Sequence, residues 1–344
     1  MKKNKKLSSR IFTVSEWRNR MIDHHKPKLS FSGTTCEDYR NWRRGFEKEF
    51  RKLLGLLPDP VPLRAEIIER KIFPTYVREK VVFDAEQFMS VPAWVCSPRR
   101  TAKTGKYPAV VCCHGHGHGK DALAGIMPNG RAGVDYQKKL AVELAENGYV
   151  AIAPDWRCFG ERNEPPENQP HPCNLGHLAA ESLGYNLLTL DIWDGMKTVD
   201  YLESRDNVDQ SRIGCVGCSF GGTMSMFLSA VDLRISVSCI SGYLMAPGTC
   251  SFSGTCGSQA LPGLLTLGDR AEVAGLICPR PLLIQIGEYD SVFPARHALK
   301  EYKRLQRIYR AAGQTDRLAL DRFDGCHEIH VAPIIEWFNR WLIV

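Results

Sequence analysis

The feature that most constrains this chain is the pentapeptide Gly217-Cys218-Ser219-Phe220-Gly221, here called the serine turn. An apolar run at residues 212–216 precedes it, and a helix-compatible segment at 222–230 follows. G-x-S-x-G between a strand and a helix predicts a tight turn that holds the serine in a strained backbone conformation with its hydroxyl exposed. The flanking glycines leave room for this turn because they lack a Cβ atom. We therefore predict that Ser219 is a nucleophile.

The pattern of apolar runs predicts the fold class. From residue 107 onward, strand-like runs alternate with helix-compatible segments, and runs such as 108–113 are apolar throughout, as expected of strands buried on both faces. Repeated strand–helix units predict a mostly parallel, doubly wound sheet with right-handed crossovers. Residues 63–97 alternate in the manner of strands, which predicts an antiparallel meander at the N-terminal edge of the sheet. The expected class is α/β.

Helical segments and domain bounds follow from the same patterns. A helical extension is expected at residues 1–60, where apolar side chains recur every three or four residues, and the catalytic domain at 61–344. The apolar stripe of the extension favours packing on its own domain over a dimerisation arm. Residues 242–268, rich in Gly, Ser, Cys and Pro, are expected to form a loop or small cap beside the site. The predicted helices lie at 15–22, 37–57, 136–147, around 178–204, 294–312 and 331–342.

Composition argues against several other classes of protein. The 344 residues, 44% of them apolar, can bury a large core, yet no run approaches the ~18 apolar residues of a membrane span. The net charge is +7, but the sequence has no cluster of basic residues with aromatic residues between them. We therefore expect no nucleic-acid partner. The 13 cysteines are odd in number and irregularly spaced, which favours reduced thiols in a cytoplasmic protein without a secretory signal. Cys215 and Cys218, formally C-x-x-C, are interpreted as small buried fillers.

A serine nucleophile needs a base that accepts its proton and a carboxylate that orients the base. Asp290 follows the apolar run at 281–286, and His327 follows the run at 318–323, so both are expected on loops at the carboxyl edge of the sheet. We assign His327 as general base and then acid, and Asp290 as the orienting carboxylate. The alternatives are that Asp290 is only a helix cap, or that Glu288 or His330 takes the acid or base role.

The negative charge that develops on an attacked carbonyl oxygen needs fixed hydrogen-bond donors. The expected donors are the backbone N–H of Phe220 and the backbone N–H of His116, the latter in the Gly-rich loop 114–119. The alternating imidazoles of His114, His116 and His118 leave metal binding as an alternative for this loop. The Gly-rich loop after a buried strand fits an oxyanion loop better, and neither a metal nor a cofactor is expected.

These motifs resemble the α/β-hydrolase superfamily, in particular bacterial acetyl xylan esterases and dienelactone hydrolases. The resemblance runs from about residue 63 to the end and is carried by the residues 155–161, 208–222, 261–265 and 274–282. It implies an α/β-hydrolase fold and carboxylic-ester hydrolysis through an acyl-enzyme without a cofactor. Dienelactone hydrolases carry cysteine where this chain has Ser219. Arg157 lies in the loop similar to the family's Asp-x-Arg-Gly-x-Gly, and it has either a substrate-binding or a structural role.

The sequence thus predicts a cytoplasmic serine esterase for small acyl groups, with acetylated sugars as one substrate class. Its expected partner is a small-molecule ester. Binding to a nucleic acid or a membrane is not expected, and the sequence leaves open whether the protein forms a homo-oligomer. One alternative is a peptidase or amidase related to prolyl oligopeptidases, although residues 1–60 are too few for a propeller. Another is a non-catalytic binding protein with the hydrolase fold, which would not need the complete Ser219, His327 and Asp290 set.

Overall fold

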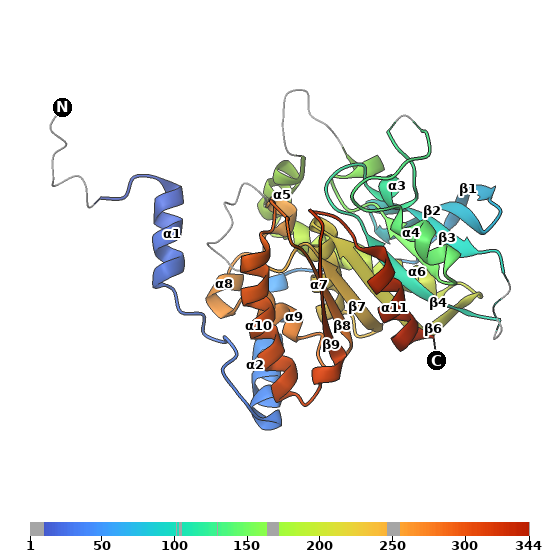
Figure 1. The fold of residues 1–344 in the computed structure, drawn as a ribbon. Helices are drawn as coiled ribbons and strands as arrows, with labels where there is room; N and C mark the ends of the chain where they lie inside the picture. Colours follow the sequence, from blue (N-terminus) through green and yellow to red (C-terminus); the bar gives the residue numbers. More distant parts are fainter. Residues whose placement is uncertain are drawn as a thin grey trace.

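The fold is built on one nine-stranded sheet with the strand order β1-β2-β3-β5-β4-β6-β7-β8-β9 (Figure 1). The computed structural model describes residues 10–100, 102, 105–128, 130–163, 172–245 and 255–343. The strands are β1 (Glu66–Ile72), β2 (Tyr76–Glu86), β3 (Met89–Pro98), β4 (Tyr107–Cys113), β5 (Val150–Pro154), β6 (Val208–Cys218), β7 (Ile235–Ser241), β8 (Leu282–Gly287) and β9 (Leu318–Phe323).

Pairing within the sheet changes direction once. β1, β2, β3 and β5 pair antiparallel in that order, whereas β5, β4, β6, β7, β8 and β9 pair parallel. This confirms the predicted mostly parallel sheet with an antiparallel N-terminal edge. The parallel strands end together, so the loops that follow β4, β6, β8 and β9 meet at one edge of the sheet.

The long helices agree with the prediction except at two places. They are α1 (Val14–His24), α2 (Cys36–Leu54), α5 (Pro172–Ser182), α6 (Leu187–Glu203), α7 (Phe220–Val231), α10 (Ala295–Ala311) and α11 (Val331–Leu342). The shorter helical segments are α3 (Lys120–Leu123), α4 (Leu140–Glu146), η1 (Gly160–Arg162), η3 (Gly257–Gln259), α8 (Leu264–Leu267), α9 (Arg270–Gly275) and η4 (Thr315–Arg317). Within the described ranges, no helix has both the length and the apolar character that a membrane span requires.

The two departures have a backbone cause. The helix predicted to begin at residue 136 begins at 140, because Lys138 and Lys139 adopt positive φ angles of 54° and 46°, which an α-helix cannot contain. The single helix predicted around 178–204 is two helices, separated at Gly184 with φ 81°. Apolar spacing does not reveal the break at Gly184, since Leu183 and Tyr185 on either side of it are apolar.

Both faces of the sheet are covered, which explains why its central strands are apolar throughout. Along β4, Ala109, Val111 and Cys113 belong to one cluster of buried side chains, and the alternate residues Val110 and Cys112 belong to another. The first cluster includes side chains of α2, α6, α7 and α10, and the second includes those of α4 and α11. Figure 1 shows α11 and α4 on the other side of the sheet from α10 and α2.

The two N-terminal helices differ in how they pack. α2 buries Tyr39, Phe46, Phe50 and Leu54 in the core, and the Phe50 ring stacks on Phe227 of α7 with 6.0 Å between centroids. α1 has no buried residue and stands away from the sheet in Figure 1, with Trp17 55% exposed. Packing of the apolar stripe on its own domain therefore holds for α2. The division at residue 60 stays a prediction, as does the cap at 242–268, of which residues 246–254 lie outside the described residues.

Arg157, just beyond β5, belongs to a buried ion-pair network that fastens the end of β5 to α6. Its guanidinium donates two hydrogen bonds of 3.0 Å to the carboxylate of Asp194 and one of 2.5 Å to Glu86. Burial, the largest single effect, would lower the pKa of Arg157, but Asp194 and the other neighbouring carboxyl groups together outweigh it and the pKa is raised. The Nε and Nη2 atoms of Arg157 thus donate to carboxylates within the protein, which favours the structural role over substrate binding.

Asp191 lies beside this network and carries a perturbed carboxyl group. Its Oδ1 accepts a hydrogen bond of 2.9 Å from the backbone N–H of Arg157. Its Oδ2 is buried without a hydrogen-bond partner among the described residues. Burial, followed by the neighbouring Asp194 charge, raises the pKa of Asp191 to about 8. The folded protein therefore holds this carboxyl group in its protonated form at neutral pH.

Replacing Asp191 with asparagine should remove a pH-dependent loss of stability. In the unfolded chain the pKa of this carboxyl group is about 3.9. Between that pH and about 8, the folded state therefore binds more protons than the unfolded state does. The free energy of unfolding contributed by Asp191 therefore falls as the pH rises through this window. Asp191→Asn mimics the protonated acid and does not titrate. Thermal unfolding should show a Tm advantage of the variant that grows with pH up to about 8; a pH-independent difference would contradict this interpretation.

Candidate active site

The serine turn connects β6 directly to α7, and Ser219 stands at its apex with φ 63° and ψ −124°. This is a backbone conformation that residues other than glycine rarely adopt. Two contacts explain the glycines around it. A Cβ atom on Gly221 would overlap the carbonyl oxygen of Cys113 at the end of β4, and one on Gly217 would lie 2.5 Å from that same oxygen. The turn can therefore close against β4 only with glycine at both positions.

Asp290 and His327 form a direct pair at the ends of β8 and β9. His327 Nδ1 lies 2.8 Å from Asp290 Oδ2. The other oxygen, Asp290 Oδ1, accepts backbone hydrogen bonds of 2.8 Å from Val292 and 2.7 Å from Phe293. Asp290 therefore orders its own loop, and this fixes the oxygen that faces the imidazole. It is not the helix cap of the alternative interpretation, because the N-cap residue of α10 is Pro294 and no side chain caps that helix. The His327 ring is held between Tyr136 and Phe293, with centroid distances of 5.6 and 5.5 Å.

Ser219 lies at the same place as this pair. Its N–H donates to the carbonyl oxygen of Ser241 at 3.1 Å, so the serine turn touches the end of β7. The next residue, Gly242, lies against the pair, because a Cβ atom there would be 3.2 Å from His327 Nδ1 and 3.4 Å from Asp290 Oδ2. Ser219 and the Asp290–His327 pair thus both lie against the segment Ser241–Gly242 at the end of β7.

The substitute acid and base have other partners. Glu288 pairs with Arg322 through contacts of 2.5 and 2.6 Å on the surface. His330 Nδ1 lies 3.0 Å from Asp321 and its side chain is 43% exposed. Cys218, inside the serine turn, is fully buried, and burial raises the pKa of its thiol to about 12. A thiol with that pKa is protonated at neutral pH and is a poor nucleophile. Its burial also agrees with the interpretation of Cys218 as a filler.

The loop after β4 lies beside Ser219. A Cβ atom on Gly115 would be 3.1 Å from Ser219 Cβ and would overlap the Tyr136 hydroxyl. That hydroxyl donates to the carbonyl oxygen of His116 at 2.8 Å, and the Gly115 N–H donates to Gln137 at 2.7 Å. Within the described part of the chain, the N–H of His116 donates no hydrogen bond. Phe220 is the first residue of α7, so its N–H has no acceptor within the helix.

The three imidazoles of this loop do not converge on one point. His114 is fully buried, and burial lowers its pKa to about 4, while its Nε2 accepts a hydrogen bond of 3.1 Å from the N–H of Trp156. His118 is exposed. His116 Nε2 lies 3.2 Å from the sulfur of Cys256. Among the described residues, the group with suitable metal-ligating atoms is His116 with Cys173 and Cys256.

Sequence reasoning missed Tyr136 and Phe293, the two rings that enclose His327. Tyr136 was placed at the start of a predicted helix, although the chain turns there instead. Phe293 comes three residues after Asp290, and the only signal for it is this proximity in the sequence. Tyr136 also contacts the loop after β4 through its hydroxyl. Tyr136 therefore links His327 to the loop that carries His116.

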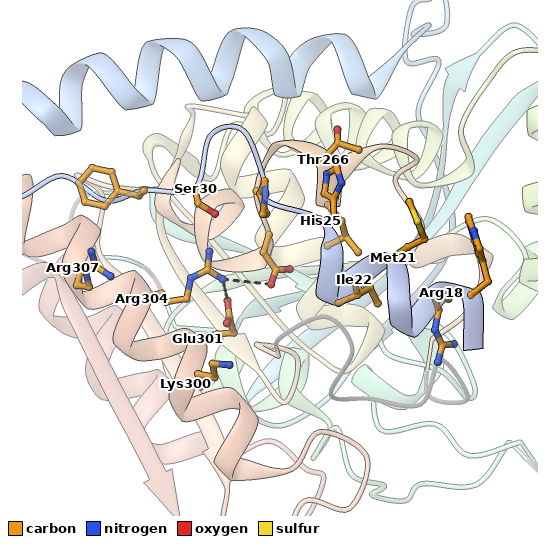
Figure 2. A pocket seen from close by; sticks show the side chains of 16 residues that line it. Arg18, Met21, Ile22, His25, Ser30, Thr266, Lys300, Glu301, Arg304 and Arg307 are labelled. Carbon is orange, nitrogen blue, oxygen red and sulfur yellow. Dashed lines mark hydrogen bonds and ion pairs between the residues drawn. The ribbon is translucent and has the colours of Figure 1, made fainter. Parts of the chain in front are cut away.

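A cavity of about 680 Å³ lies at a different place, between α1, α10 and the chain around residue 266 (Figure 2). Its lining includes Trp17, Met21, Thr266 and Arg304, and none of the predicted site residues. Arg304 Nη1 donates a hydrogen bond of 2.6 Å to Glu301 Oε2, and Figure 2 marks the contact between these two residues. With no nucleophile–base pair in its wall, this cavity is not the candidate active site.

The nine-stranded sheet, with a strained serine between β6 and α7 and an acid–imidazole pair at the ends of β8 and β9, is an α/β-hydrolase fold. Residues 4–246 match the model of the Abhydrolase family, and the chain belongs to that family. Asp290 and His327 lie beyond the matched region, so their assignment depends on the contacts described above.

Similar proteins agree with this classification. The protein named YtaP of Bacillus subtilis (strain 168) is 29% identical over 313 residues, which cover 86% of this chain and 98% of YtaP. A candidate acetyl xylan esterase from Bacteroides fragilis NCTC 9343 superposes with a TM-score of 0.75 and 18% identity, covering 93% of this chain and 84% of that one. The methylesterase BT1017 superposes with a TM-score of 0.71 and 21% identity. The superposition covers 95% of this chain and 68% of the methylesterase chain. At these identities the two structures show the fold.

Substitution of the second glycine of the serine turn tests whether the turn requires its close contact with β4. Gly221→Ala places a methyl group onto the Cys113 carbonyl. The overlapping atoms belong to the backbone, so no side-chain movement can remove the clash. We expect a loss of roughly 1–3 kcal/mol or more in the free energy of unfolding. The matched control is Gly45→Ala in α2, where a Cβ atom meets nothing within 4 Å, and which should gain about 0.5–1 kcal/mol. Urea unfolding measures both; equal effects would contradict this account.

Proposed function

We propose that this protein is a serine hydrolase that cleaves carboxylic esters of small acyl groups with Ser219, His327 and Asp290 as its catalytic triad. The observation that carries the proposal is the 2.8 Å contact between His327 Nδ1 and Asp290 Oδ2 beside the strained Ser219. A paired imidazole next to a serine with positive φ is the arrangement that nucleophilic acyl transfer requires.

In the proposed first half-reaction, Ser219 Oγ attacks the ester carbonyl carbon while His327 Nε2 accepts the hydroxyl proton. Asp290 holds the Nδ1–H of the imidazole and stabilises the imidazolium that forms. His327 then gives the proton to the departing alcohol, which leaves an acyl group on Ser219. In the second half-reaction, His327 deprotonates a water molecule that attacks the acyl-enzyme, and the carboxylic acid is released.

The oxyanion of each tetrahedral intermediate would be bound by the backbone N–H groups of Phe220 and His116. Two features support this assignment: the N–H of Phe220 has no acceptor within α7, and the loop that carries His116 lies against Ser219. Tyr136 would position that loop, because its hydroxyl bonds the His116 carbonyl and its ring contacts His327. These donors would stabilise negative charge that exists only in the transition state and intermediate.

The substrate class is proposed from the chemistry and from the esterase names of two similar structures, an acetyl xylan esterase candidate and a methylesterase. Acetylated sugars are the first class to test, and the reaction would need no cofactor. Cytoplasmic location remains part of the proposal, supported by the twelve described cysteines, none of which forms a disulfide.

Removing the nucleophile tests the proposal. Ser219→Ala should lower kcat for p-nitrophenyl acetate by on the order of 10⁴-fold or more, because the covalent step is lost. The matched control is Ser32→Ala, a change at an exposed serine in the chain before α2, which should leave kcat unchanged. Tm values for both variants would verify folding. Turnover by a folded Ser219→Ala protein at the wild-type rate would reject the triad.

A panel of substrates separates the remaining functions. We expect hydrolysis of p-nitrophenyl acetate and acetylated xylose to exceed that of longer acyl esters and of aminoacyl amides, measured as kcat/KM. Preference for the amides would instead indicate a peptidase of the prolyl-oligopeptidase type. The absence of turnover on every substrate would indicate a binding protein with the hydrolase fold.

A further inference from the structure

Three metal-ligating side chains from distant parts of the chain meet beside the loop that follows β4. His116 comes from that loop, Cys173 from the first turn of α5, and Cys256 from the residue before η3. The imidazole nitrogen and the two sulfur atoms all lie within 4.8 Å of one another. His116 Nε2 is 3.2 Å from Cys256 Sγ. We call these three residues the His116–Cys173–Cys256 cluster.

The cluster is held in place by its surroundings. The His116 ring contacts Phe159 at 5.2 Å and Phe220 at 5.5 Å between centroids, which fixes its orientation. Cys173 is buried, with 3% of its surface exposed, whereas His116 and Cys256 are partly exposed. A metal ion could therefore reach the cluster from solvent and then be bound by an ordered set of side chains.

Backbone contacts keep the segments of Cys173 and Cys256 together. The N–H of Gly257 donates to Asn174 at 2.8 Å, and a Cβ atom on Gly257 would lie 2.8 Å from the Cys173 carbonyl oxygen. Gln259 anchors the same turn to α7, because its amide nitrogen donates to Thr223 at 2.9 Å. The two sulfur atoms are therefore brought together by the packing of η3 on α5 and α7, and they do not form a disulfide.

The ligand types and their spacing suit zinc. One imidazole and two thiolates are a common ligand set for Zn²⁺ and are softer than those that Mg²⁺ or Ca²⁺ prefer. With Zn–S near 2.3 Å and Zn–N near 2.0 Å, tetrahedral ligand atoms stand about 3.5–3.8 Å apart. The separations in the cluster, 3.2 Å for one pair and at most 4.8 Å for all, need only small side-chain shifts to reach these values.

A further imidazole lies near the cluster. His177 lies one helical turn after Cys173 on α5. The Cβ atom of its side chain packs against Gly257, the residue after Cys256. The Nδ1 atom of His177 is buried and has no hydrogen-bond partner among the described residues. A buried nitrogen without a partner is costly unless something else satisfies it. The nitrogen is therefore an unsatisfied polar atom near the cluster, although His177 is not one of the residues whose ligating atoms lie within 4.8 Å of one another.

We propose that His116, Cys173 and Cys256 form a zinc site that ties the loop after β4 to α5 and η3. The sequence favoured no metal, and its metal alternative involved His114, His116 and His118; of these only His116 takes part. The zinc would bind the His116 side chain and so connect the loop that carries it to Cys173 and Cys256. The three protein ligands would leave the fourth position of a tetrahedral zinc to water, and the proposal does not depend on ester hydrolysis.

Zinc content of the purified full-length protein tests the site directly. Protein prepared with a phosphine reductant, loaded with ZnCl₂ and passed through a desalting column should retain one zinc per chain by mass spectrometry of the metal. Cys173→Ser and Cys256→Ser should each lose this zinc. Cys36→Ser, which removes an exposed thiol in the first turn of α2, should keep it and controls for adventitious thiol binding.

Cobalt substitution and stability provide readouts that do not depend on activity. Co²⁺-loaded wild-type protein should show thiolate-to-cobalt charge-transfer absorption that Cys173→Ser and Cys256→Ser lack and Cys36→Ser retains. Chelation should lower the Tm of the wild type but not that of Cys256→Ser. The proposal would be overturned by protein that retains no zinc after loading, by zinc retained equally in all the cysteine variants, or by a Cys173–Cys256 disulfide in unreduced protein.

Discussion

The contact between the serine turn and the end of β4 is the constraint on which the site depends. Two glycines lie so close to the Cys113 carbonyl oxygen that no side chain could replace their hydrogens without moving backbone. This closeness allows β6 to pass into α7 within one residue, and that residue, Ser219, takes a positive φ of 63°. The strain at Ser219 is therefore maintained by packing across the sheet rather than by the turn itself. The same contact places the loop of His116 against Ser219.

The remaining groups are held by hydrogen bonds at the same edge. Asp290 uses one oxygen to order its own loop and the other to face His327, so its orientation is set before any substrate arrives. Tyr136 extends this order to the loop after β4, because its ring packs on His327 and its hydroxyl bonds the His116 carbonyl. Preorganisation of this kind is the main source of electrostatic stabilisation in hydrolytic sites.

Much of this arrangement is predictable from the sequence, since the parallel strands and the serine turn have local signals. The strand at 318–323 and the helix at 331–342 have the predicted bounds. The positive φ angles at Lys138 and Lys139 were not predictable, because lysine gives no signal for a left-handed backbone. Nor were the partners of Arg157, or the meeting of His116 with Cys173 and Cys256, since these contacts join segments far apart in the sequence. The roles of the site residues remain predictions that the geometry supports.

Covalent labelling is the measurement that tests the central claim most directly, because it asks whether the Ser219 hydroxyl is activated. Folded wild-type protein treated with a fluorophosphonate should gain one phosphonyl group, and peptide mass spectrometry should locate it on Ser219. His327→Ala should slow this labelling strongly while Tm shows that the protein is folded. Labelling that falls on another residue, or a folded wild-type protein that does not react at all, would contradict the account.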